Sequence, residues 1–147
     1  MGRKFVIAML SVMIVFTACL TDFFPVGFPV PVGSEVYAVL GNERILLSRE
    51  DAKNVIYILR NEYWRGREGN CPFDFNIGFE IGNNRYAIAM DGCSTVDMYS
   101  VAGKYIYGGG TPYPDSRTAT PYYFKYFDDD DISEYFKHIE ENNVNEV

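Results

Sequence analysis

The sequence predicts an α+β fold: a small antiparallel sheet of about six strands with two helices packed on one face. Residues 73–81 and 86–90 alternate apolar and polar side chains with the period of a strand. Residues 48–63 and 131–139 instead repeat apolar side chains with the period of a helix. Short turns separate successive strand patterns, so the sheet should be antiparallel.

The first expected elements are a hairpin and a helix. Short apolar runs at 35–40 and 44–47 flank the turn signal Gly41-Asn42. Ser48 can cap the following helix, and Asp51 three residues later approximates a capping box. The apolar stripe of this helix consists of Ala52, Val55, Ile56, Leu59 and Tyr63. The helix should end by Gly66.

The next expected element is a hairpin built from the two alternating segments. Asn83-Asn84 is the predicted turn, because asparagine tolerates the left-handed backbone that a tight turn requires. Pairing Ile81 with Tyr86 would place the large apolar side chains of both strands on one face. The same register pairs Phe79 with Ile88 and Ile77 with Met90.

The remaining chain should add strands, a long loop and a second helix. Residues 95–99 and 104–107 suggest two strands around Ala102-Gly103, and 122–127 suggests a last strand. Residues 108–121 hold glycines and prolines and are expected to form a loop. The C-terminal helix should begin near Asp131, with Ile132, Tyr135, Phe136 and Ile139 on its apolar side.

The first residues have the layout of an export signal. Arg3 and Lys4 precede an apolar run of about twelve residues, which is shorter than the roughly eighteen of a membrane-spanning helix. The run ends in Phe16-Thr17-Ala18-Cys19, which resembles the lipobox of bacterial lipoproteins, although that family usually has leucine where this chain has Phe16.

The lipobox resemblance implies cleavage after Ala18 and acylation of Cys19, which would anchor the protein to a membrane. Ordinary secretory cleavage beside Ala18, or an uncleaved anchor extended through Leu20, would also place the domain outside the cytoplasm. We therefore expect a signal peptide at 1–18, an acylated cysteine with a Pro/Gly-rich linker at 19–34, one domain at 35–142 and a frayed tail at 143–147.

Composition restricts the partners of the mature chain. Without Arg3 and Lys4, 11 basic residues face 20 acidic ones, a formal net charge of −9. Phosphate binding depends on lysine and arginine, so nucleic acid is not an expected partner. Attachment to a membrane should come from acyl chains at Cys19 rather than from basic patches.

The cysteine count predicts a disulfide. With Cys19 assigned to the lipid, Cys71 and Cys93 remain as an even pair, and an oxidising compartment favours their pairing. Their Cα atoms would have to come within about 7 Å. The alternative is an envelope hydrolase with Cys93 as nucleophile and His138, the single histidine, as its base.

Tyrosines around the expected loop form a candidate contact surface. A tyrosine combines an apolar ring with a polar tip, which suits a protein or glycan ligand, although cross-strand packing would use the same residues. The loop itself is 108–121, and long loops in small domains are often functional. The candidates are Tyr105, Tyr107, Tyr113, Tyr122 and Tyr123.

The run Asp128, Asp129, Asp130 and Asp131 is a weak candidate for Ca²⁺, and acids at a helix start more simply cap free amides. No other metal or cofactor motif is present in the sequence. We expect a non-enzymatic binding domain of the cell envelope. The alternatives are the hydrolase and a structural envelope protein without a ligand.

Overall fold

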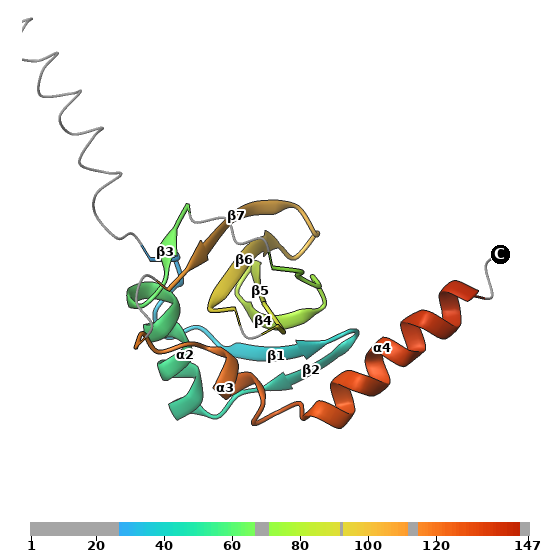
Figure 1. Cartoon of the computed structure of the whole chain (residues 1–147). Coiled ribbons are helices and arrows are strands. Elements are labelled where there is room, and N and C mark those ends of the chain that lie inside the picture. The colour runs from blue at the N-terminus through green and yellow to red at the C-terminus, as the bar shows by residue number, and fades with distance from the viewer. Residues whose placement is uncertain (1–26, 67–70, 92, 112–114, 145–147) are drawn as a thin grey trace, which may run out of the picture.

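A computed structural model describes residues 27–66, 71–91, 93–111 and 115–144. These residues form one seven-stranded antiparallel sheet and three helices (Figure 1). The strand order is β2-β1-β4-β5-β6-β7-β3, and Figure 1 shows the sheet strongly twisted. The predicted α+β class and antiparallel sheet are confirmed, with seven strands in place of about six.

The elements follow one another in a simple order along the chain. The strands are β1 (Val36–Leu40), β2 (Glu43–Leu46), β3 (Trp64–Arg65), β4 (Ile77–Ile81), β5 (Asn84–Ile88), β6 (Thr95–Ser100) and β7 (Tyr105–Gly110). The helices are α2 (Arg49–Asn61), α3 (Thr120–Tyr123) and α4 (Asp129–Val144). Because β2 and β3 are the two edges of the sheet, α2 carries the chain from one edge to the other.

The first hairpin and α2 form as their local sequence predicts. Gly41 has the positive φ of 62° that the tight turn between β1 and β2 requires. The Asp51 backbone N–H donates to Ser48 Oγ at 3.1 Å, so Ser48 caps α2. The helix ends at Asn61, earlier than Gly66, because Trp64 and Arg65 pair with β7 as an edge strand.

The central hairpin differs from the predicted one in length and in register. Strand β4 begins only at Ile77, because Asp74 turns the chain by accepting hydrogen bonds from the N–H groups of Asn76 and Ile77. Phe79 pairs with Tyr86, two residues from the predicted partner. Gly82, with φ of 60°, supplies the turn that was expected at Asn83-Asn84. A shift of two preserves the faces of a strand, so the apolar face was predicted correctly.

One face of the sheet, called the inner face below, carries the core. Its central cross-strand row comprises Ala38, Phe79, Tyr86, Met98 and Tyr107. Helix α2 buries Val55, Ile58 and Leu59 completely, and these residues share one apolar cluster with the row. The opposite, outer face carries the row Tyr37, Glu80, Arg85, Tyr99 and Tyr105.

The segment before β1 belongs to the domain. The predicted linker covered 19–34, of which the structure describes 27–34, and Phe28 and Val30 in this part are buried. The Phe28 N–H donates to Leu59 O at 2.9 Å. Its ring stacks on Tyr107 at a centroid distance of 5.4 Å. The predicted signal peptide, Cys19 and residues 20–26 lie outside the described residues.

The chain after β6 corrects two predictions. Glycines 108–110 continue β7 instead of starting the loop, and a Cβ at Gly109 would come within 3.0 Å of the Phe28 ring. Residues 120–123 form helix α3 instead of the start of a strand. The helix turns Tyr123 into the core, where its hydroxyl donates to Val39 O at 2.8 Å.

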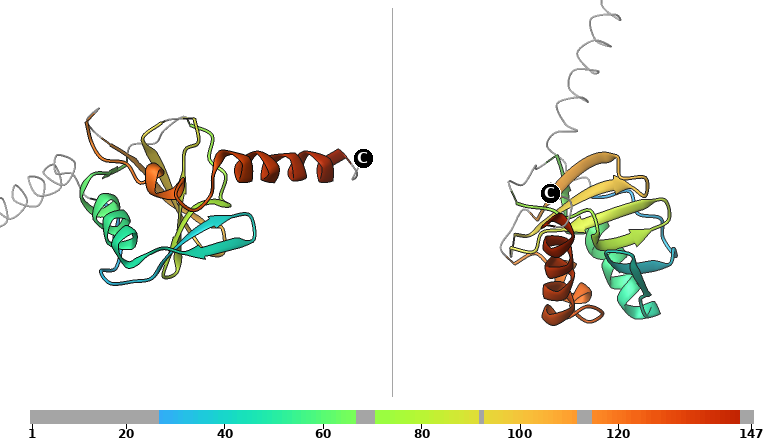
Figure 2. Two further views of the ribbon diagram at one scale, coloured as in Figure 1. Left: turned by 90° about the horizontal axis from the view of Figure 1, so that it is seen from below. Right: turned by 90° about the vertical axis from the view of Figure 1, so that its right-hand side faces the viewer.

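The C-terminal helix leaves the body of the domain. Ile132 is buried, and Tyr135 is half-buried with its hydroxyl donating to Asp74 Oδ2 at 2.9 Å. Phe136 is 41% exposed, and Figures 1 and 2 show α4 projecting away from the sheet. The predicted packing of two helices on one face is therefore not confirmed.

We expect Phe28→Ala to lower the free energy of unfolding by about 3 kcal/mol, because a buried aromatic ring is lost and a cavity remains between α2 and β7. Chemical denaturation followed by circular dichroism measures the change. Val32→Ala is the matched control, since Val32 lies in the same segment and is 77% exposed. It should alter stability by less than about 0.5 kcal/mol. Equal effects of the two substitutions would contradict the inclusion of this segment in the core.

Candidate functional site

The Cys71 and Cys93 sulfur atoms lie at disulfide distance, as the cysteine count predicts. Their Cα atoms are 6.6 Å apart, within the range that a disulfide can bridge. The pair joins the segment before β4 to the segment before β6 across 22 residues of chain. In the chain-entropy model a loop of this size stabilises a fold by about 3 kcal/mol.

Asp91 lies beside the cysteine pair. Its Oδ1 accepts a hydrogen bond from Cys93 N at 3.0 Å, and its Oδ2 is 3.4 Å from Cys93 Sγ. Within the described ranges, Cys71, Asp91 and Cys93 are the one group of three potential metal ligands that converges, to within 4.8 Å. With the sulfurs paired, the group offers a metal ion only the Asp91 carboxylate, because thiolates are the ligand form of cysteine.

The two residues of the hydrolase hypothesis have different surroundings. Cys93 is paired with Cys71, whereas His138 lies on α4 with 67% of its side chain exposed. The His138 ring nitrogens are 3.6 and 3.9 Å from carboxylate oxygens of Glu134 and Glu141. In the part of the chain that the structure describes, no hydrogen bond joins Cys93 to His138, so the nucleophile–base contact of that hypothesis is not formed.

The acidic run is arranged around the start of α4. Asp128 Oδ1 accepts hydrogen bonds from the N–H groups of Asp130 and Asp131, at 2.9 and 3.0 Å. Asp131 Oδ2 accepts in return from Asp128 N at 2.9 Å. This reciprocal pattern satisfies helix amides that lack an intrahelical partner, which is the capping role of such residues. Asp129 is exposed in the same turn.

The predicted tyrosines do not form one surface. Tyr105 is 42% exposed on the outer face, whereas Tyr107 stacks on Phe28 in the core. Tyr123 is fully buried, and burial raises its pKa. Tyr122 lies half-buried in α3, with Lys125 Nζ 4.8 Å from its ring centroid. Tyr113 lies outside the described residues. Among the described candidates, Tyr105 is exposed and Tyr107 and Tyr122 are half-buried, and the three belong to different parts of the fold.

A surface around α3 combines hollows with aromatic and cationic side chains. One hollow, of about 360 Å³, is lined by Arg117, Thr118, Pro121, Tyr122 and Lys125. A second, of about 440 Å³, is lined by Cys93, Ser94, Thr118, Thr120, Pro121 and Phe124. The two share Thr118 and Pro121, so they form one region that we call the α3 surface. It contains the end of the loop that the sequence marked as a contact region.

Both cations of the α3 surface are already neutralised. Lys125 Nζ donates to Asp51 Oδ1 at 2.5 Å, and Arg117 Nε is 3.5 Å from Glu62 Oε1. Arg117 also lies 4.7 Å above the Tyr57 ring. The surface therefore presents aromatic and polar groups with little net charge, which suits an uncharged polar ligand.

Asp51 connects the α3 surface to the start of α2. The Lys125 ammonium lowers the pKa of Asp51, and the hydroxyls of Tyr126 and Ser48 lower it further against the opposing effect of burial. The Tyr126 hydroxyl donates to Asp51 Oδ2 at 2.9 Å and accepts from Ser48 N at 2.8 Å. These hydrogen bonds join Asp51 to Lys125 and Tyr126, which lie 74 and 75 positions later in the chain. They hold the α3 segment against α2.

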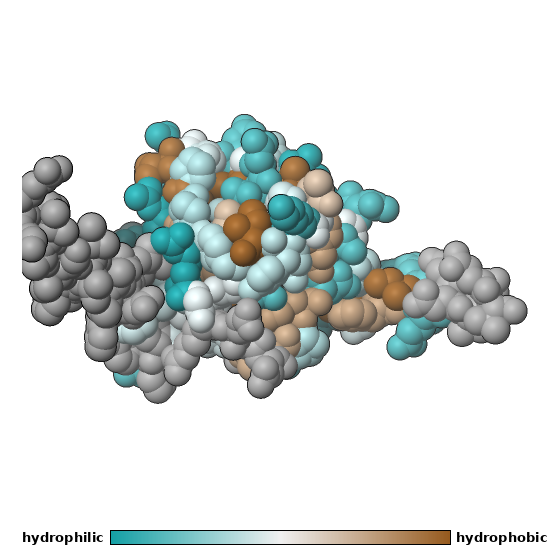
Figure 3. Space-filling model, turned by 90° about the horizontal axis from the view of Figure 1, so that it is seen from above, coloured by the Kyte–Doolittle hydropathy of each residue, from teal (hydrophilic) through white to brown (hydrophobic). Residues whose placement is uncertain are grey.

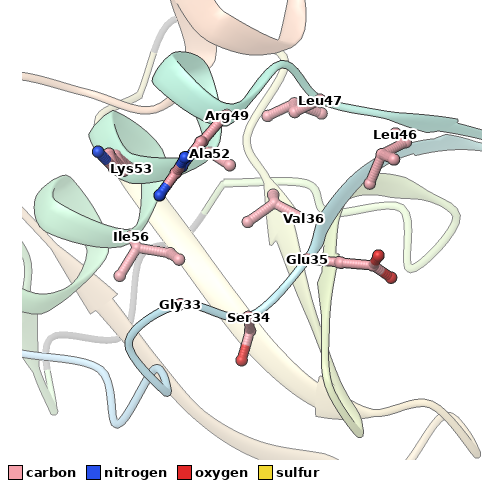
Figure 4. Close-up of a pocket in the computed structure, with 10 residues that line it drawn as sticks. All are labelled: Gly33, Ser34, Glu35, Val36, Leu46, Leu47, Arg49, Ala52, Lys53 and Ile56. Carbon is pink, nitrogen blue, oxygen red and sulfur yellow. The ribbon is translucent and has the colours of Figure 1, made fainter.

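A separate hollow of about 390 Å³ lies between α2 and the hairpin of β1 and β2 (Figure 4). The sequence pattern places Ala52 and Ile56 on the apolar stripe of the helix but does not indicate a hollow, because the lining residues come together only in the folded chain. Figure 3 shows one face of the molecule, on which apolar residues gather in small patches between hydrophilic ones.

Comparison with known proteins finds no family model, no curated protein and no solved structure that matches this chain. A search of the described residues finds no helix that is long and apolar enough to cross a membrane.

We expect Asp51→Asn to destabilise the protein at pH 7 and to lose this effect progressively as the pH falls below 3.8. The folded pKa of Asp51 lies below its ordinary value of 3.8, so the ionised carboxylate stabilises the fold above that pH. The contribution is lost as the pH falls through the folded pKa. Denaturant unfolding of both proteins at about pH 7 and pH 2.5 measures the difference.

Glu50→Gln is the control for Asp51→Asn, because Glu50 is an exposed acid in the same turn of α2. It should change stability little at either pH. An Asp51→Asn effect of the same size at both values of pH would show that charge does not contribute to this network.

Proposed function

We propose that this protein is a non-enzymatic binding domain of the cell envelope, exported from the cytoplasm and anchored to the membrane through an acylated Cys19. The observation that carries this proposal is the leader, in which Arg3, Lys4, an apolar run and Phe16-Thr17-Ala18-Cys19 follow the order of a lipoprotein signal. The geometry of Cys71 and Cys93 supports it, because disulfides persist in oxidising compartments.

The proposed tether is short. Eight residue steps separate Cys19 from Gly27, where the described domain begins. A chain of this length spans at most about 28 Å when fully extended. The acylated protein would therefore work close to the bilayer surface, as a receptor or adaptor for material at the membrane.

The α3 surface is the proposed contact site. Phe124 is 38% exposed there, and Tyr122 and Pro121 add ring surface beside it. A glycan fits this combination, because the apolar faces of sugar rings pack on aromatic rings while their hydroxyls bond to polar groups. The neutralised charges of Arg117 and Lys125 favour an uncharged glycan over a strongly charged partner.

We expect a mass spectrum of the native protein to show a chain that begins at an acylated Cys19, with Cys71 and Cys93 oxidised. Export brings the protein to the lipid-modifying and oxidising environment before it folds completely, so both modifications should occur together. Reduction before alkylation is the control, and it should make two cysteines reactive. A chain that starts at Met1 with three free thiols would contradict the proposal, and a free Cys93 would reopen the hydrolase hypothesis.

We expect Tyr122→Ser combined with Phe124→Ser to weaken binding of the native protein to isolated cell-envelope glycan by at least about tenfold. The reason is the loss of exposed ring surface, and a tenfold change corresponds to about 1.4 kcal/mol. Sedimentation with the glycan fraction measures the bound protein.

Phe136→Ser is the matched control for this experiment, because Phe136 is 41% exposed on α4, away from the α3 surface. Binding should be unchanged in that variant. Binding that disappears after protease treatment of the envelope fraction would identify a protein partner instead. Equal loss in the control would remove the α3 surface from the proposal.

A further inference from the structure

The hollow between α2 and the first hairpin has an apolar interior. Val36, Leu47 and Ile56 form part of its lining and are 0%, 5% and 7% exposed, so these walls are fixed by the core. Leu46 lies at the same hollow and is 52% exposed. This leaves apolar surface uncovered beside a preformed cavity, which is the usual composition of a small-molecule site.

Two cationic side chains, Arg49 and Lys53, lie on the α2 side of this hollow. Figure 4 shows the nitrogens of Arg49 and Lys53 on that side, with apolar side chains between them and Glu35. Among the residues that the structure describes, neither cation forms an ion pair or a side-chain hydrogen bond. Their charges are thus available to a ligand.

The other cations near hollows behave differently. Arg44 pairs with Glu80 at another hollow, and Lys125 pairs with Asp51 at the α3 surface. An acidic chain with 20 carboxylates against 13 basic residues has ample acids for such pairing. Arg49 lies in the first turn of α2, where the helix dipole disfavours a positive charge, so it does not stabilise the helix. Stabilisation of the helix therefore does not explain the position of Arg49.

Glu35, on the opposite side of the hollow, limits the charge that a ligand can carry there. Its carboxylate accepts a hydrogen bond from the Tyr37 hydroxyl at 2.8 Å and points away from Arg49 and Lys53 in Figure 4. A ligand with negative charge at both ends would meet this carboxylate. A ligand with one anionic end and one apolar arm matches the charge distribution along the hollow.

We propose that this hollow binds a small amphipathic monocarboxylate, with the carboxylate between Arg49 and Lys53 and the hydrocarbon arm against Val36, Leu47 and Ile56. A carboxylate forms charge-assisted hydrogen bonds with both cations, and arginine can bind it in a bidentate manner. A volume of about 390 Å³ holds a small molecule of this class. The residues that line this hollow and those of the α3 surface share no member, so the proposal is independent of the glycan site.

Octanoate is a suitable probe for the native protein in nanodiscs of zwitterionic lipid, with empty discs as the background for partition into lipid. We expect saturable binding of octanoate in equilibrium dialysis. Octylamine and octanol should bind at least about tenfold more weakly, because they lack the anion. Arg49→Gln combined with Lys53→Gln should weaken octanoate binding by at least about tenfold, equivalent to 1.4 kcal/mol.

Lys104→Gln combined with Lys137→Gln removes the same charge from exposed positions outside the hollow and should leave octanoate binding unchanged. Glutamine is a good helix former, so the Arg49 and Lys53 variant should unfold at the same denaturant concentration as the native protein. Absence of saturable octanoate binding would overturn the proposal. Equal binding of octylamine, or equal loss in both double variants, would also overturn it.

Discussion

Phe28 is the residue on which the arrangement of this fold depends. Its ring contacts Tyr63 just after α2, Tyr86 in β5 and Tyr107 in β7, at centroid distances of 6.1, 5.7 and 5.4 Å. Gly27 allows this approach, because a Cβ there would lie 1.6 Å from Arg60 O. One side chain thus joins the N-terminal segment, the helix and two strands that are distant in sequence.

This contact also fixes the position of α2, which lines the hollow beside the first hairpin and bonds to the α3 segment through Asp51. The C-terminal end of the helix is held by the hydrogen bond from Phe28 N to Leu59 O, and its N-terminal end by the network around Asp51. The α3 segment packs on that network, while the hairpin of β1 and β2 lies along the side of α2 that bears Lys53. Both ends of α2 are therefore held by contacts with segments distant in sequence.

The sequence predicted the elements whose causes are local. Gly41 and Ser48 determine the first hairpin and the start of α2, and alternation identified the apolar face of β4 and β5. It did not predict that Gly109 continues a strand, because the reason is the distant ring of Phe28. Tyr123 was predicted as a contact-surface residue, because its burial also depends on a distant partner. Its hydroxyl donates a hydrogen bond to Val39 O, 84 positions earlier in the chain. Cysteine counting alone predicted the Cys71–Cys93 pair.

The use of cations distinguishes the two hollows, and this difference was not visible in the sequence. At the α3 surface, Arg117 and Lys125 are paired with carboxylates, so the surface carries little net charge. At the other hollow, Arg49 and Lys53 have no such partner among the described residues, and an apolar wall lies beside them. Paired charges beside rings favour an uncharged polar ligand, whereas free charges beside an apolar wall favour an amphipathic anion. Pairing, which depends on tertiary contacts, therefore distinguishes the electrostatics of the two hollows more than the residue types do.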